Sequence, residues 1–244
     1  MAEKQKIAKD LDENIKYLKD LLGVGESFDI IFREYKIGRK RAASFSINGM
    51  TNDVLLTNVF QDMILINQEE LSINTLEKLF YSHATHSQVK LSSDMSDAVT
   101  SLLSGELLFL VDGEAQIIIF DARAYPARMP NESTIEKVTR GSRDSFVETL
   151  PFNTSLIRRR LRDPNLRFEI VKIGARSRTD VAVCYIKDIT NPELVATVKS
   201  RLNEIDIDGI PMAERAVEEN IVGGSKWNPF PLVRYTERPD VAAV

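Results

Sequence analysis

Hydrophobic residues recur with helix and strand periods in turn along the first half of the chain. A series at spacings of four and three predicts an amphipathic helix ending at Gly23, formed by Ile7, Leu11, Ile15, Leu18 and Leu22. Alternating segments predict two hairpins, 28–37 with 42–48 and 107–111 with 115–120, the second turning at Asp112-Gly113. Helices are expected at about 52–66, 74–81 and 95–103, and a short strand near 88–91.

The second half of the chain repeats this order of elements. Lys36-Ile37-Gly38 recurs as Lys172-Ile173-Gly174 at a strand end, and Thr51-Asn52 recurs as Thr190-Asn191 before a helix. Counted from the threonines, four hydrophobic positions coincide: Leu55, Val59, Met63 and Ile66 with Leu194, Val198, Leu202 and Ile205. Generic periodicity shared by chance is the alternative explanation. The pattern favours an α/β fold, more narrowly α+β, with two similar lobes, each a small and mainly antiparallel sheet packed with helices.

The expected organisation is a first lobe at 1–125, a linker at 126–134, a second lobe at 135–225 and an extended segment at 226–244. Pro151 falls inside the second lobe's first helix and predicts a kink or an interruption there. On the matched helices, the side chains expected to be buried are Leu55, Val59, Leu194, Val198 and Leu202. The last segment is too apolar for a free tail, so we expect it to lie against the first lobe, through Trp227, Phe230, Leu232, Val233 and Tyr235.

Composition limits the class of protein. The chain has 244 residues, of which 43% are hydrophobic and 28% charged, with a net charge of −4, as in ordinary globular proteins. This balance argues against a nucleic-acid partner bound through overall basicity. The longest apolar runs have the length of strands, and the first residues lack the apolar stretch of a signal peptide, so a soluble chain is expected.

No set of residues in the sequence predicts catalysis, a metal site or a cofactor. His83 and His86 have no third ligand at a fixed spacing, and the single cysteine, Cys184, is expected to be a buried structural thiol. Gly23-Val24-Gly25 follows a helix rather than a strand, so helix termination explains it better than phosphate binding. The sequence therefore predicts a protein that is not an enzyme.

Charge is unevenly distributed along the second lobe. Residues 137–178 contain 11 Lys or Arg and 4 Asp or Glu, whereas 203–220 contain 6 acidic residues and 1 basic residue. These stretches are solvated faces, or they pair between lobes or subunits, or the basic one meets anionic lipid. The candidate assembly residues are Arg140, Arg143, Asp144, Glu148, Arg158, Arg159, Arg160 and Arg162.

Successive helix positions point about 100° apart, so the arginines at 158–160 cannot all face one way. We expect one to pack toward its own lobe and another to face outward, and all three to be exchangeable for glutamine without loss of folding. In the final segment, the candidate coupling residues are Arg234, Glu237, Arg238 and Asp240.

Several long motifs resemble a known family. Residues 137–167 (KVTRGSRDSFVETLPFNTSLIRRRLRDPNLR), 206–213 (DIDGIPMA) and 228–243 (NPFPLVRYTERPDVAA) are similar to the A-subunit family of bacterial spore germination receptors. Residues 23–29 (GVGESFD) and 231–243 resemble one branch of that family. The position of Pro151 departs from the family pattern, in which proline is unusual there.

The resemblance implies a function that composition and spacing do not. It implies the soluble N-terminal domain of a spore inner-membrane protein, on the cytosolic (spore core) side, with membrane helices following 238–243. In the full-length protein it further implies a homo-oligomer, a small membrane partner protein, and an ion channel that promotes ion release during germination. The alternative is a sensing domain that binds a nutrient or other small molecule between its two lobes.

Overall fold

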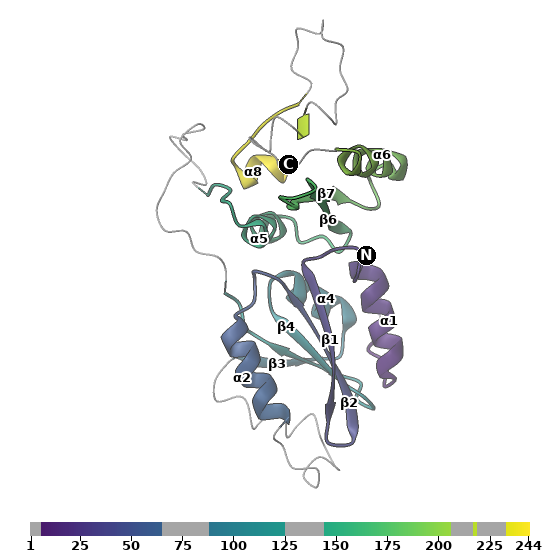
Figure 1. The fold of residues 1–244 in the computed structure, drawn as a ribbon. Coiled ribbons are helices and arrows are strands. Elements are labelled where there is room, and N and C mark those ends of the chain that lie inside the picture. Colours follow the sequence, from purple (N-terminus) through teal and green to yellow (C-terminus); the bar gives the residue numbers. More distant parts are fainter. Residues whose placement is uncertain (1–5, 65–87, 125–143, 206–216, 219–232) are drawn as a thin grey trace, which may run out of the picture.

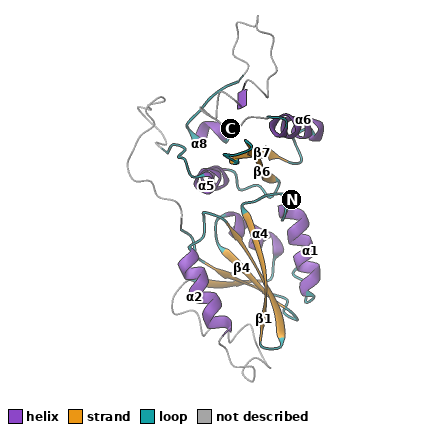
Figure 2. Cartoon of the chain, in the orientation of Figure 1, coloured by secondary structure: helices purple, strands orange, loops and turns teal. Residues whose placement is uncertain are grey.

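The structure, a computed structural model, describes residues 6–64, 88–124, 144–205, 217–218 and 233–244. Two antiparallel sheets, each packed with helices, follow one another along the chain (Figures 1 and 2). We call the described residues 6–124 the first unit, and residues 144–205 with 233–244 the second unit. The predicted α+β class is confirmed, with one sheet of five strands and one of two.

The first unit is built on the five-stranded sheet. Its elements are α1 (Leu11–Leu22), β1 (Ile30–Ile37), β2 (Lys40–Ile47), α2 (Asp53–Ile64), β3 (Val89–Ser92), α4 (Met95–Leu103), β4 (Leu107–Val111) and β5 (Ile117–Phe120). The strand order is β1-β2-β4-β5-β3, with every neighbouring pair antiparallel. Helices α1 and α4 cover one face of the sheet and α2 covers the other (Figure 1).

Local signals set the ends of these elements. The Asp10 side chain accepts a hydrogen bond from the backbone N–H of Asp12 at the start of α1, and Gly23 ends that helix at φ 68°. The Asn52 side chain accepts from the backbone N–H groups of Val54 and Leu55, so the asparagine rather than Thr51 caps α2. The predicted helix end at Gly23 and the predicted helix at 95–103 are both confirmed.

The second unit is smaller. It consists of α5 (Leu150–Arg160), β6 (Leu166–Ile173), β7 (Thr179–Ile186), α6 (Pro192–Asn203) and α8 (Pro239–Ala242). Helix α6 covers one face of the two-stranded sheet, and α5 and α8 lie on its other side, packed together (Figure 1). The order helix, strand, strand, helix thus occurs in both units, as the repeated sequence pattern predicts.

Two expectations for the second unit are wrong. Pro151 does not kink a helix, because α5 begins at Leu150 and the proline lies in the first turn, where a missing N–H costs nothing. Leu194 is 57% exposed, although its helix does bury Leu202 at 1%.

The other side chains expected to be buried on the matched helices have mixed outcomes. Val198 and Leu55 are half-buried, and the Val59 side chain lies outside the described residues. The predicted helix at 74–81 and the linker at 126–134 also lie outside them.

None of the helices within the described ranges is both long and apolar enough to cross a bilayer.

Candidate functional site

The arginine-rich end of α5 lies where the two units meet. Arg158 is 1% exposed, and its Nε lies 2.9 Å from Oδ2 of Asp29, which belongs to the first unit and is also 1% exposed. The guanidinium donates two further hydrogen bonds, to the carbonyl oxygens of Asp163 at 2.9 Å and Leu166 at 3.0 Å. The guanidinium carbon, Cζ, lies 5.3 Å from the centre of the Phe168 ring. The arginine is therefore a buried, hydrogen-bonded tie between units, and the expectation of an exchangeable surface charge is wrong for Arg158.

Backbone groups complete this contact. The Phe28 N–H donates to the carbonyl oxygen of Phe168 at 3.0 Å, and the Phe168 N–H donates to Ser27 Oγ at 2.9 Å. The same serine hydroxyl donates to Oδ1 of Asp29 at 2.6 Å. Both carboxylate oxygens of Asp29 therefore have donors, which is the condition under which a buried charge is tolerated. We call residues 26–29 together with Arg158, Arg167 and Phe168 the joint.

A second buried arginine, Arg167, joins the units beside the first. It is 1% exposed and donates through Nη2 to the carbonyl oxygen of Leu21 at 3.0 Å. Its Nε lies 3.4 Å from Oε2 of Glu26, which also pairs with Lys187 at 2.8 Å. The hydrogen bond from Lys187, with a smaller contribution from Arg167, lowers the pKa of the Glu26 carboxyl although burial opposes the shift.

Gly23 lets Arg167 approach this closely. A Cβ atom at position 23 would lie 2.2 Å from Arg167 Nε, a distance that no side chain could occupy without displacing the guanidinium. The φ of 68° also favours glycine at this helix end. The glycine therefore serves both the end of α1 and the packing of the joint.

The remaining candidate assembly residues have different surroundings. Arg159 and Arg160 lie 3.4 and 2.7 Å from Oδ2 of Asp144, and Arg162 donates to Ser104 Oγ of the first unit at 3.1 Å. Glu148 is exposed. Arg140 and Arg143 lie outside the described residues. The structure thus brings Asp144 together with two of the arginines and places Arg158 apart from them, and the assembly role of the group remains a prediction.

The C-terminal segment packs on the second unit. The Phe146 N–H donates to the carbonyl oxygen of Glu237 at 2.7 Å, and α8 packs against α5. For the described residues 233–244, the expected contact with the first lobe is therefore replaced by contact with α5; Trp227, Phe230 and Leu232 lie outside the described residues.

Local charge pairing in this segment is as expected. Arg238 occupies the N-cap position of α8 without a side-chain capping bond, and it pairs with Asp240, whose pKa it lowers chiefly through a hydrogen bond. Arg234 is exposed, and Glu237 is half-buried and lines a pocket beside α5.

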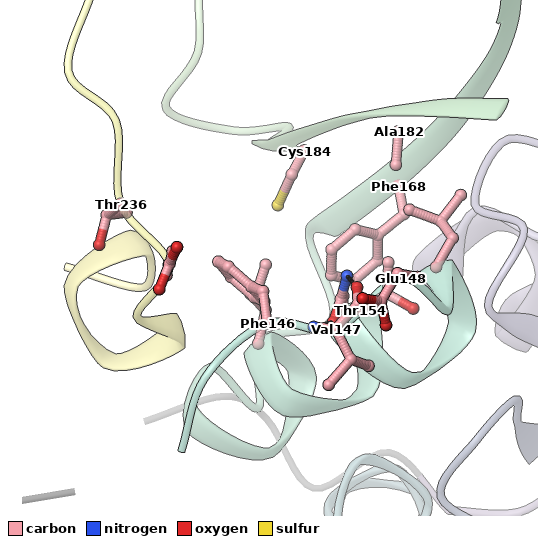
Figure 3. A pocket seen from close by; sticks show the side chains of 12 residues that line it. Phe146, Val147, Glu148, Thr154, Phe168, Ala182, Cys184 and Thr236 are labelled. Carbon is pink, nitrogen blue, oxygen red and sulfur yellow. Dashed lines mark hydrogen bonds between the residues drawn. The ribbon is translucent and has the colours of Figure 1, made fainter. Parts of the chain in front are cut away.

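A pocket of about 460 Å³ lies within the second unit, between α5, the sheet and the C-terminal segment (Figure 3). Its wall is mixed, with aromatic, aliphatic, hydroxyl, carboxylate and thiol groups from Phe146, Leu150, Thr154, Phe168, Cys184 and Glu237. Cys184 is exposed here, which corrects the expectation of a buried thiol. Its surroundings nevertheless desolvate the sulfur and raise the pKa of Cys184 to about 11, so the thiol is protonated at neutral pH and weakly nucleophilic. Within the described ranges, no group of three or more His, Cys, Asp or Glu side chains is placed to hold a metal ion.

Comparison with known proteins gives the family. A model of the "Bacillus/Clostridium GerA spore germination protein" family matches residues 16–244. The chain belongs to this family.

Among curated members of the GerA family, "Stage V sporulation protein AF" of Bacillus subtilis is 39% identical over 241 residues, which cover 99% of this chain and 49% of that protein. "Spore germination protein B1" of the same organism is 32% identical, with 96% and 48% covered. The chain thus spans about half the length of these relatives. The solved N-terminal domain of the A subunit of the Bacillus megaterium spore germinant receptor GerK3 is 29% identical with a TM-score of 0.73, covering 98% of this chain and 88% of that one.

Two GerA-like motifs meet in the joint. The stretch 23–29 provides Glu26, Ser27 and Asp29, and the stretch 137–167 provides Arg158 and Arg167. Sequence reasoning missed Asp29 and Arg167 as partners, because no spacing rule connects positions more than a hundred residues apart. The only sequence signal was that both residues belong to motifs resembling the family.

Proposed function

We propose that this chain is the N-terminal part of a spore inner-membrane germination protein, in which it assembles and couples an oligomeric ion channel that promotes ion release. Family membership supports the germination role, since the relatives are named as spore germination proteins. The observation that supports coupling is that α5 contacts both the first unit and the C-terminal helix α8.

Helix α5 can transmit a displacement because both of its contacts are specific. Near its C-terminal end, Arg158 is fixed by a buried carboxylate and two carbonyl oxygens. Beside its N-terminal end, Phe146 is bonded to Glu237, directly before Arg238 and α8. Movement of the first unit therefore acts on the last segment of the matched region, beyond which the longer relatives are expected to continue, since the similar solved structure is named as an N-terminal domain. Packed and hydrogen-bonded elements of this kind are the physical basis of coupling between distant sites.

The proposal includes partners and a location. In the full-length protein we infer a homo-oligomer and, as a separate partner, a small membrane protein of the germination channel, with this domain on the cytosolic (spore core) side. Arg159, Arg160 and Arg162 lie near the surface of α5 and the turn after it, and Glu148 is exposed before the helix. These residues are the candidate contacts between copies.

The test is Arg238→Ala in the full-length protein, because this change removes the pairing with Asp240 at the start of α8. We expect ion release from nutrient-stimulated spores to slow severalfold at unchanged protein level. Arg41→Gln is the matched control, since Arg41 forms a similar but exposed pair with Asp12 far from α8. Unchanged ion release in the Arg238→Ala spores, or equal slowing in both, contradicts the coupling function.

The alternative function, a small molecule bound between the two lobes, has less support. The described contact between the units is filled by the joint, and the pocket in Figure 3 lies inside the second unit. Thermal-shift measurements with amino acids and sugars separate the two functions. A true ligand at 100 times its dissociation constant stabilises the chain by about 2.7 kcal/mol, and such a shift would favour the sensor.

A further inference from the structure

Strand β7 has an open edge. In an antiparallel pair, opposed residues alternate between those that exchange both backbone hydrogen bonds and those that direct them outward. Phe168 directs both of its backbone groups outward, to Ser27 and Phe28, and it is opposed by Cys184. Cys184 therefore also directs its N–H and C=O outward, away from β6, and so do Ala182 and Asp180. Within the part of the chain that the structure describes, these outward groups have no hydrogen-bond partner.

The first unit shows what normally lies beside such an edge, because the two units share specific contacts. Asn14 bonds both backbone groups of Ala8 through its side chain, at 3.0 and 2.7 Å. Asn153 bonds both backbone groups of Val147 in the same way, at 2.8 and 2.6 Å. Both asparagines lie in the first helix of their unit, six residues after their partner. Shared periodicity does not produce this arrangement, so the units are structural repeats.

The C-terminal segment extends the correspondence. The Ile7 N–H points to the carbonyl oxygen of Ser93 at 3.5 Å, directly before the α4 cap Asp94. In the second unit, Phe146 takes the place of Ile7 and bonds Glu237, directly before the α8 cap Arg238. Helix α8 therefore corresponds to the start of α4, and the extended residues before it correspond to β3.

The strands that correspond to β4 and β5 are the missing part. In the first unit, β2 pairs on its outer edge with β4, which pairs with β5. Phe45 and Ala43 of β2 correspond to Cys184 and Ala182 of β7. Phe45 and Ala43 are fully buried in a hydrophobic cluster that also contains residues of β4 and β5, namely Leu108, Leu110, Ile117 and Ile119. Cys184 and Ala182, by contrast, line the pocket in Figure 3.

The same comparison explains the exposed apolar residues of the second unit. Ile189 and Leu194 are 77% and 57% exposed. Their counterparts are Met50, which is fully buried, and Leu55, which packs against the cluster containing β4 and β5 residues. Apolar side chains on both faces of the two-stranded sheet thus lack the cover that their counterparts have.

We propose that a β-hairpin, supplied by the residues that follow Val244 in the longer protein, pairs with the open edge of β7 and fills this pocket. The completed sheet repeats the arrangement of the first unit. The hairpin comes from the same chain because α8 lies where α4 begins, and α4 leads into β4 within a few residues. The relatives are about twice as long as the matched region, and the similar solved structure is named as the N-terminal domain of its subunit, so chain is expected to follow the matched region in such proteins. The pocket is then an unfinished core rather than a ligand site, and the hairpin precedes any membrane helix.

Thiol labelling tests the proposal on both faces of the sheet. The chain 1–244 is compared with a chain that is extended past Val244. The extension is somewhat longer than the stretch from Thr100 to Phe120, because that stretch of the first unit contains the rest of α4 and the hairpin of β4 and β5. The probes are Cys184 itself and, in a Cys184→Ser background, Ile189→Cys and Leu194→Cys. Glu193→Cys is the matched control, because its counterpart Val54 is 71% exposed in the complete first unit.

We expect maleimide labelling of all three probes to slow more than tenfold in the longer chain, with Glu193→Cys unchanged. If the longer chain does not stay in solution, the added segment supplied as a peptide to chain 1–244 must give the same protection. Equal labelling of Cys184 in both chains overturns the proposal. Protection of Cys184 alone indicates a pocket ligand instead, and protection of chain 1–244 that rises with its own concentration indicates a second copy. Either of those results also overturns the proposal.

Discussion

Replacing Arg158 by methionine should destabilise the domain strongly, because it removes one member of a buried ion pair. The Asp29 carboxylate, at 1% exposure, would keep the Ser27 hydroxyl as a donor but lose the charged one, and the carbonyl oxygens of Asp163 and Leu166 would each lose one of their donors. Breaking a buried pair from one side typically costs about 3–5 kcal/mol. We expect a loss of free energy of unfolding in that range.

The assay is urea unfolding at pH 7, followed by circular dichroism. Arg41→Met is the control, since its pair with Asp12 is exposed and such pairs contribute at most about 1 kcal/mol. The double variant Arg158→Met/Asp29→Asn should recover part of the loss, because it removes the unpaired charge. A loss below about 1 kcal/mol for Arg158→Met, or a double variant less stable than the sum of the singles, would refute the role assigned to this ion pair.

Three further predictions concern the joint and the second core. Gly23→Ala should cost more than Gly25→Ala in urea unfolding, by about 1–3 kcal/mol, because both glycines have positive φ but only position 23 meets Arg167; equal costs would show that the contact is unimportant. Since pairing lowers the pKa of Glu26 in the folded state, its contribution to stability is present above the unfolded value of about 4.5 and is lost as pH falls through the lower folded value. Glu26→Gln should therefore flatten the loss of stability below pH ~4.5, and an unchanged pH profile contradicts this. Leu202→Ala should cost about 2–5 kcal/mol and Leu194→Ala less than about 0.5 kcal/mol in chain 1–244, and similar values would mean that both are equally packed.

Local elements were predictable because their causes are local. The helix ending at Gly23 follows from apolar spacing and a left-handed glycine, and the helix at 95–103 from its apolar spacing. The repeat of helix, strand, strand and helix was likewise visible in the sequence.

Residues whose surroundings come from distant parts of the chain were not predictable in this way. Arg158 appears in the sequence as one of three equal surface charges, and only the fold places Asp29 beside it. Leu194 lies on an apolar stripe, but nothing in its own helix shows that the sheet beneath it has only two strands in the described residues. Pro151 was expected inside a helix, whereas α5 begins only one residue before it, and the sequence pattern did not show that boundary.

The central claim is that the first unit and the C-terminal helix are coupled through α5, and a double-mutant cycle of ion release tests it most directly. Spores would contain full-length protein with Asp29→Asn, Arg238→Ala or both, at matched protein levels. If the two positions act through one path, the combined loss in the logarithm of the ion-release rate should be clearly smaller than the sum of the single losses. Losses that simply add would contradict the coupling.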